Sequence, residues 1–514
     1  MVKKTFILNT IMLTSASLIA RIIGIGFRVY MSNKIGPEGM GLFQLIGIFY
    51  LFCANFAVSG ISVAVTRLIT DSVAKKEYRK SKLYLRLCLI ISVGISLIIS
   101  SVAFIYSDEI SLSILRDGRT ALSLRMLSIS LPFMAVSACF RGYFYAVRKA
   151  FNTASEQLLE QIIEILIFSA AVGTLAPKGL EYACLSIVLG TTCAEAISCV
   201  YAVVLYKIDK RQFSSESVSR LNALKKISSI AVPITLSNCL RSGLSTAENV
   251  LIPEGFKKMG HSCSKSLSIY GLIMGMVMPV ITFPTAILYS ASSLLIPELS
   301  EAKAINHKKS IKHVVNKSLY LSAVFSIIVA VIFAFFSNDL GKTIYHNTQT
   351  GTYIKILAPI VPFMYLDGIV DGMLKGLNQQ TFYLICNIID AIIRLLLIYF
   401  LLPIYGVYAL IGIMFFSTIF NSLFSIWRLL KVTHIKLDIF NFILRPLFCS
   451  LISCSSSCFL LNSNYIPVFA YPVKLILEIS LSLIIYTILL MPCHIIFHKV
   501  NSRIKTTPRL FSRQ

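Results

Sequence analysis

The N-terminal part of the sequence places two arginines inside a long apolar stretch. Arg21 and Arg28 lie within SASLIARIIGIGFRVYMSNK, a segment typical of a membrane-spanning helix. Side chains seven residues apart point in directions that differ by about 20° around the helix axis, so Arg21 and Arg28 share a face. An arginine at the bilayer centre costs roughly 2.5–3.5 kcal/mol on insertion scales, and such residues usually face a polar cavity. Because guanidinium groups grip phosphate through paired hydrogen bonds, the pair indicates a polyanion-binding site.

Two further arginines lie in later apolar segments. Arg67 is near the end of the second segment, and Arg241 is inside the seventh. Aligning LIARIIG with NCLRSGL puts Arg241 opposite Arg21, so we expect both to line one central cavity. The alternative for each arginine is a structural role, in which it snorkels to the interface or pairs with an acid.

Acidic residues in the apolar segments are candidates for ion coupling or for structural ion pairs. Glu156, Glu160 and Glu164 repeat every four residues, and we favour the interpretation that they form an acidic helix N-terminus near the lipid headgroups. Asp390 and Arg394 have the spacing of an ion pair along one helix, and Glu195 stands alone. The acids that we name as possible coupling or structural residues are Glu160, Glu164, Glu248, Asp367 and Asp371.

The composition excludes a soluble protein. Of 514 residues, 56% are hydrophobic and 14% charged, against about 45–50% and 25% in soluble domains. The net charge of +25 resides mainly in short loops between apolar segments, whereas a nucleic-acid-binding protein gathers it on one face. The thirteen cysteines are scattered without zinc-ligand spacing, and no complete phosphate-binding loop is present. We therefore expect a membrane protein that is not an enzyme and has no cofactor, metal ion or nucleic-acid partner.

Fourteen segments are long enough to span a bilayer, at about 20 residues each. Alternate loops are rich in lysine and arginine, which predicts that these loops and both chain termini are cytoplasmic. The expected spans are 7–31, 42–69, 83–106, 122–147, 156–176, 181–206, 227–252, 269–297, 316–337, 353–375, 382–402, 406–430, 441–461 and 472–497.

The chain also repeats itself. The tripeptide Pro132-Phe133-Met134 recurs 230 residues later as Pro362-Phe363-Met364. Six spans per repeat predict two lobes in the same orientation, related by a pseudo-two-fold axis along the membrane normal. The expected organisation is an N-lobe (1–210), a cytoplasmic linker (211–226), a C-lobe (227–432), and a final part with two further spans and a basic cytoplasmic tail (433–514).

Three stretches resemble one known group of proteins. The sequences RIIGIGFRVYMSNKIGPEGMGLFQLI, SGISVAVTRL and YGLIMGMVMPVITFPTAILYSASSLLIPELSEA resemble the stage V sporulation protein B group. That group belongs to the polysaccharide-transport branch of the multidrug/oligosaccharidyl-lipid/polysaccharide (MOP) exporter superfamily. The resemblance implies an all-α fold of two six-helix lobes around a cavity that opens alternately inward and outward. It also implies that Arg21, Arg28 and Arg67, and through a looser motif Arg241, hold the pyrophosphate of a lipid-linked substrate.

These observations lead to one functional hypothesis and two alternatives. The hypothesis is a plasma-membrane flippase for a polyprenyl-pyrophosphate-linked saccharide, foremost the peptidoglycan precursor lipid II, serving cell-wall or spore-cortex synthesis. Its expected partners are the lipid-linked oligosaccharide, membrane lipids and cell-wall synthesis enzymes. The alternatives are a cation-coupled multidrug exporter of the same fold and a non-transporting scaffold for cell-wall enzymes.

Overall fold

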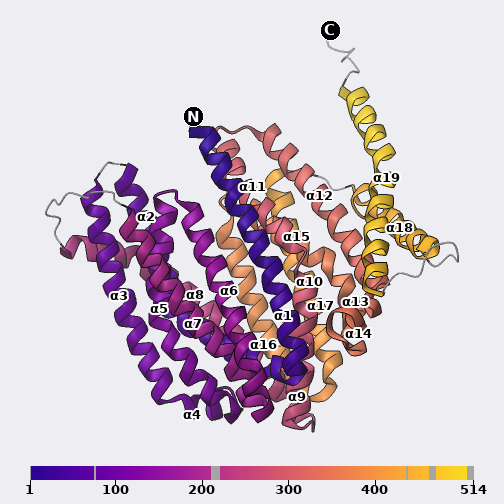
Figure 1. Cartoon of the computed structure of the whole chain (residues 1–514). Helices are drawn as coiled ribbons and strands as arrows, with labels where there is room; N and C mark the ends of the chain where they lie inside the picture. Colours follow the sequence, from indigo (N-terminus) through magenta and orange to yellow (C-terminus); the bar gives the residue numbers. More distant parts are fainter. Residues whose placement is uncertain (1, 75–76, 210–219, 436–437, 462–470, 506–514) are drawn as a thin grey trace. The chain divides into compact units, whose positions relative to one another are not determined.

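The computed structural model describes residues 2–74, 77–209, 220–435, 438–461 and 471–505, and every regular element in these ranges is a helix (Figure 1). This confirms the expected all-α class. Parts of the predicted linker (211–219) and of the basic tail (506–514) lie outside the described residues.

The helices follow one another in chain order. Residues up to 208 form α1 (Val2–Ala54), α2 (Gly60–Ala74), α3 (Tyr78–Ile105), α4 (Ser107–Glu109), α5 (Ala121–Ala146), α6 (Ala150–Leu175) and α7 (Leu180–Ile208). The next are α8 (Arg220–Lys258), α9 (Cys263–Tyr270), α10 (Met278–Thr282), α11 (Thr285–Ala304), α12 (Lys308–Phe335), α13 (Ser337–Tyr345), α14 (Thr348–Leu357) and α15 (Val361–Gly376). The last are α16 (Gln380–Tyr405), α17 (Val407–Thr433), α18 (Arg445–Leu461) and α19 (Tyr471–Lys505). Short π-helical turns are η1 (Asn55–Ser59), η2 (Ile110–Ile114), η5 (Gly271–Val277) and η7 (Phe440–Leu444), and short 3₁₀ turns are η3 (Gly118–Thr120), η4 (Ala176–Lys178) and η6 (Ala358–Ile360).

Twelve segments of the described chain are long and apolar enough to cross a membrane, which makes this a multi-pass membrane protein. The first, Ile19–Val73, has 55 residues and suffices for two crossings of about 20 residues each. The expected number of fourteen is not confirmed. α8 and α11 are outside the twelve because charged and polar residues, such as Arg241 and Glu248 in α8, interrupt their apolar runs.

A sharp bend at Gly36 divides α1. Its φ of 70° and ψ of 179° are not helical, and this backbone region favours glycine because a Cβ would strain it. Pro37 follows and has no N–H to continue the helical hydrogen bonds. The bend therefore separates the first two predicted spans, 7–31 and 42–69.

A second break corrects the eighth predicted span. Residues 269–297 were expected as one apolar segment, but α10 ends at Thr282 and α11 begins at Thr285. Pro284 lies between them, where its ring and its missing N–H end the preceding helix.

The chain forms two compact units. Unit 1 comprises Met1–Phe283 with Ile388–Met414, and unit 2 comprises Pro284–Asn387 with Phe415–Gln514. The expected lobe boundaries stay a prediction.

Unit 1 is built around α5. This helix packs against α2, α3 and α7, while α6 packs against α7 and α1. Its core includes Phe140, Tyr143 and Phe144, all nearly inaccessible, and the rings of Tyr143 and Tyr206 meet edge to face at 5.1 Å. α4 and α9 lie at the opposite end of unit 1 from the first turns of α1 (Figure 1).

Unit 2 is organised around α12 and α15. α15 packs against α11 and α12, and α18 packs against α12 and α19. The contact between α18 and α19 includes the buried hydroxyls of Ser457 and Ser482, which are 2.6 Å apart.

The two units repeat one interhelical contact at the same sequence offset of 230. In unit 1, Ser62 Oγ donates to the carbonyl of Ala138 at 3.4 Å; in unit 2, Ser292 Oγ donates to the carbonyl of Gly368 at 3.1 Å. A glycine lies four residues further on in each case, as Gly142 and Gly372. This agreement supports the repeat detected from Pro-Phe-Met.

Both glycines are required for the close approach of these helices. A Cβ at Gly142 would lie 2.9 Å from the carbonyl oxygen of Ser62, and one at Gly372 would lie 2.8 Å from that of Ser292. We expect Gly142→Ala and Gly372→Ala each to destabilise the protein by about 1–3 kcal/mol through overpacking. Thermal unfolding in detergent should show a lower midpoint for each variant.

Gly94→Ala in α3 is the matched control, because no atom lies within 4 Å of the added Cβ. Its midpoint should stay unchanged or rise, since alanine is the better helix former. Equal losses in all three variants would contradict the close-packing account.

Candidate functional site

A cavity of about 980 Å³ lies within unit 1. Its walls come from α1, α5, α6, η5 and α10. One side is apolar and includes Met274, Met278 and Phe283, while the other carries charged groups from α1, α5 and α6. A volume of this size is typical of small-molecule sites.

Arg21 and Arg28 both line this cavity from α1. Arg21 is exposed there and makes no ion pair or hydrogen bond with the residues that the structure describes; Arg28 is half-buried and lies within electrostatic range of Glu164. Gly24 lies between them on α1 and faces the side-chain amide of Gln161 on α6, since an added Cβ would lie 2.6 Å from Nε2 of Gln161. The helical spacing seen in the sequence thus puts both arginines in one site.

Arg141 of α5 is a third cavity arginine, and its charge is compensated by α6. Its Nη1 lies 3.3 Å from Oε2 of Glu160 and 3.6 Å from Oε1 of Glu156. Glu160 lines the cavity, whereas Glu156 is fully buried behind it. The interpretation of Glu156 as part of an acidic helix start near the headgroups is therefore not supported.

Glu164 also lines the cavity, one turn further along α6. Its Oε1 accepts a hydrogen bond of 2.7 Å from the hydroxyl of Thr191 on α7. Among the lining residues, three arginines thus face two glutamates.

The structure does not bring the other two predicted arginines to this cavity. Arg67 on α2 and Arg241 on α8 are exposed, and neither is among the lining residues. The expectation that Arg21 and Arg241 line one shared cavity stays a prediction.

The remaining predicted acids have cationic or hydroxyl partners. Glu248 of α8 pairs with Arg394 of α16 at 3.0 Å, and Arg394 also lies 3.6 Å from Asp390. In unit 2, Asp371 pairs with Lys375 at 2.6 Å, and the carboxylate of Asp367 accepts a hydrogen bond of 3.4 Å from Tyr383. These contacts favour structural ion pairs over ion coupling for Glu248 and Asp371.

Sequence reasoning missed Arg141. It lies inside the fourth predicted span, in ACFRGYF, so its membrane position was the available signal. Its partners are on another helix, and no spacing along the chain could have identified them.

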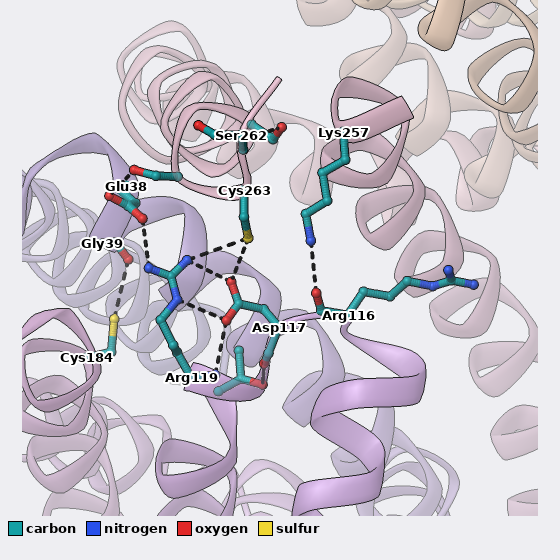
Figure 2. Close-up of polar contacts among 12 residues, drawn as sticks. Glu38, Gly39, Arg116, Asp117, Arg119, Cys184, Lys257, Ser262 and Cys263 are labelled. Atoms are coloured by element: carbon teal, nitrogen blue, oxygen red, sulfur yellow. Dashed lines mark hydrogen bonds and ion pairs between the residues drawn. The ribbon is translucent and has the colours of Figure 1, made fainter. Parts of the chain in front are cut away.

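A second polar cluster lies at the α4–α9 end of unit 1 (Figures 1 and 2). We call Glu38, Asp117, Arg119, Cys263 and Ser264 the loop cluster. Arg119 grips Asp117 through two hydrogen bonds of 3.0 and 2.8 Å and pairs with Glu38 at 2.8 Å. Ser264 Oγ donates to Glu38 at 2.6 Å, and the Cys263 thiol donates to Asp117 at 3.4 Å. The cluster therefore joins the segment after the Gly36 bend, the turn before α5 and the start of α9.

Asp117 is ionised at neutral pH. Burial raises the pKa of this carboxyl, but the hydrogen bonds and the positive charge of Arg119 outweigh burial, so its pKa lies below the usual value. Beside the cluster, Lys257 Nζ donates to the carbonyl of Arg116 at 2.9 Å (Figure 2).

Comparison with known families identifies the chain. Residues 6–303, more than half of the sequence, match the model of the family described as polysaccharide biosynthesis protein. The chain belongs to this family. Residues 230–400 also match the MatE model.

Two proteins of Bacillus subtilis (strain 168) are similar to this family member. Stage V sporulation protein B is 25% identical over 406 residues, which cover 78% of either chain. Lipid II flippase MurJ is 23% identical over 422 residues, which cover 76% of either chain. The resemblance to the stage V sporulation protein B group is thus confirmed.

Solved structures confirm the MOP-superfamily fold. An inward closed conformation of lipid II flippase MurJ has a TM-score of 0.62 at 15% identity, covering 94% of this chain and 99% of that one. An inward-facing MATE family transporter of the MOP superfamily has a TM-score of 0.64 at 13% identity, covering 80% and 93%.

The ion pairs of the loop cluster should be measurably coupled. We expect a double-mutant cycle of Arg119→Ala and Asp117→Ala to give a coupling energy of about 1–3 kcal/mol, because the paired carboxylate is buried. Arg125 and Asp108, which form an exposed pair, are the control and should give less than about 1 kcal/mol. Equilibrium unfolding in micelles of rising SDS content measures both coupling energies. Equal coupling energies for the two pairs would contradict a buried, stabilising ion pair between Arg119 and Asp117.

Cys263 allows the predicted sidedness to be tested. It is exposed, whereas the other described cysteines are buried or half-buried, and loop charge predicts that α9 begins outside the cell. A membrane-impermeant maleimide added to intact cells should therefore label the protein, and Cys263→Ser should abolish this labelling. Labelling of Cys263 only after permeabilisation would reverse the predicted topology.

Proposed function

We propose that this protein is a flippase that moves a polyprenyl-pyrophosphate-linked saccharide, foremost lipid II, from the inner to the outer leaflet. The observation that carries the proposal is the exposed guanidinium of Arg21 in the unit 1 cavity, on the same helix face as Arg28. No bond is made or broken in this process.

The physical problem is the polar head of such a lipid. An unpaired charge cannot cross hydrocarbon at acceptable cost, so the pyrophosphate needs cationic partners along its path. Arginine suits this role because its planar fork pairs with phosphate oxygens in two places and remains charged. Arg21 and Arg28 supply that chemistry, while the polyprenyl tail stays in the lipid.

Family membership and similarity to lipid II flippase MurJ support the substrate class. The inward and outward openings of a MOP-type fold provide the route by alternating access. The driving energy would come from an ion gradient or the membrane potential, which is worth about 2.3 kcal/mol per charge per 100 mV. The alternation of lysine- and arginine-rich loops supports cytoplasmic termini, and the proposed substrate implies the plasma membrane.

A cation-coupled multidrug exporter is the second candidate. It is favoured by Glu160 and Glu164 in the cavity and by the apolar wall of Met274, Met278 and Phe283. Glu160 pairs with Arg141 at 3.3 Å, however, whereas Arg21 is exposed in the cavity without an ion pair among the described residues. The cavity therefore suits an anion better than a cationic drug.

Removing Arg21 should weaken substrate binding. Charge-assisted hydrogen bonds contribute about 1.5–3 kcal/mol each, so Arg21→Ala should bind lipid II roughly ten- to hundredfold more weakly. Arg21→Lys should restore binding only in part, because the ammonium keeps the charge but loses the planar fork. Binding to the purified protein in nanodiscs measures both effects.

Arg86→Ala is the matched control, since Arg86 is an exposed arginine of α3 away from the cavity. It should bind and flip lipid II as the unmodified protein does. A well-inserted Arg21→Ala protein with normal binding and normal flipping would overturn the anion-site assignment.

A further inference from the structure

Four glutamates gather behind the cavity of unit 1 and face a single arginine of α5. Glu156, Glu160 and Glu164 come from α6, and Glu195 comes from α7. We call these four residues the carboxylate cluster. Arg141 contacts Glu156 and Glu160, as described above, and Glu195 lies within electrostatic range of Arg141 and the other three carboxyls.

Two members of the cluster are almost completely enclosed. Glu156 is 0% exposed and Glu195 is 5% exposed. One oxygen of each, Oε2, has no hydrogen-bond partner among the residues that the structure describes. An ionised carboxylate in such a position is costly unless it is paired and hydrogen-bonded. A protonated carboxyl avoids this cost.

Few other charged groups face the cluster to offset its four carboxyls. Besides Arg141, Arg28 of α1 lies within electrostatic range of the cluster, beside Glu164. Hydroxyls of Tyr50 of α1 and Tyr145 of α5, and the thiol of Cys199 of α7, also face the cluster. None of the described acidic, histidine or cysteine residues forms a group able to hold a metal ion. The ligand that fits this cluster is therefore the proton.

Two parts of the cluster also reach the cavity. Glu160 and Glu164 line it together with Arg28 and Arg141. The guanidinium of Arg141 thus forms ion pairs with carboxylates of the cluster and also lines the cavity of the proposed anion site.

We propose that the carboxylate cluster is a proton-binding site coupled to anion binding through Arg141 and Arg28. An anion in the cavity draws these two arginines away from the glutamates, and the glutamates then take up protons from water in the cavity. This proposal rests on the proposed function, because it requires an anionic substrate in the same cavity.

The linkage has a definite sign. Anion binding favours protonation of the cluster, and by reciprocity protonation favours anion binding. Uptake of one proton per bound anion would raise the association constant by up to about tenfold for each pH unit of acidification. A merely structural ion-pair cluster would show no such dependence.

The test is calorimetric binding of dimethyl pyrophosphate to the purified full-length protein in nanodiscs. This diester carries the same diphosphate linkage as a polyprenyl-linked sugar, and it does not titrate near neutral pH. Binding enthalpies measured at one pH in buffers of different ionisation enthalpy give the number of protons taken up. We expect net uptake by the unmodified protein and tighter binding at lower pH.

Glu195→Gln is the informative variant, because glutamine keeps the shape of the side chain but cannot titrate. It should lower the proton uptake and flatten the pH dependence while the probe still binds. Glu181→Gln, on the same helix but outside the cluster, should behave as the unmodified protein does.

The outcomes separate the two proposals. Binding of the probe by the unmodified protein without proton uptake would overturn the coupled proton site and leave the flippase proposal standing. Failure to bind at any pH would overturn the anion-binding cavity, and the proton site with it.

Discussion

Charge compensation inside an apolar helical unit is the constraint on which the site depends. Arg141 lies in a helix of the membrane-spanning class with its side chain only 17% exposed, and a lone guanidinium there would be very costly. Glu156 and Glu160 of α6 form ion pairs with Arg141 and compensate its charge. Once these groups are paired, α5 and α6 hold a fixed relation, and the cavity beside α1 acquires a wall of defined charge.

Small residues permit this arrangement at close range. Gly190 lets α7 approach α6, because an added Cβ would lie 2.9 Å from the carbonyl oxygen of Glu164. At the α4–α9 end of the unit, the loop cluster joins three segments. The apolar packing supplies the scaffold, and the ion pairs determine which polar groups reach the cavity.

Much of the architecture could be predicted from the sequence, because hydrophobic spans and the 230-residue repeat are local or periodic signals. The spacing of Arg21 and Arg28 likewise predicted a shared face, and the Asp390–Arg394 pair lies within one helix. Glu248, which also pairs with Arg394, could not be found in this way, since this contact depends on tertiary packing. The partners of Arg141 and the burial of Glu156 and Glu195 also depend on tertiary packing, so the sequence could not reveal them. The break at Pro284 was missed because the apolar run continues through it.

The central claim is that the protein moves a pyrophosphate-linked lipid between leaflets, and transbilayer movement in a purified system tests it most directly. Purified protein in liposomes would be given fluorescent lipid II, with other polyprenyl-linked sugars in parallel and protein-free liposomes as the blank. Our account predicts that lipid II reaches the opposite leaflet much faster with the protein than without it. Movement no faster than in protein-free liposomes, for lipid II and for every other polyprenyl-pyrophosphate sugar, would contradict it.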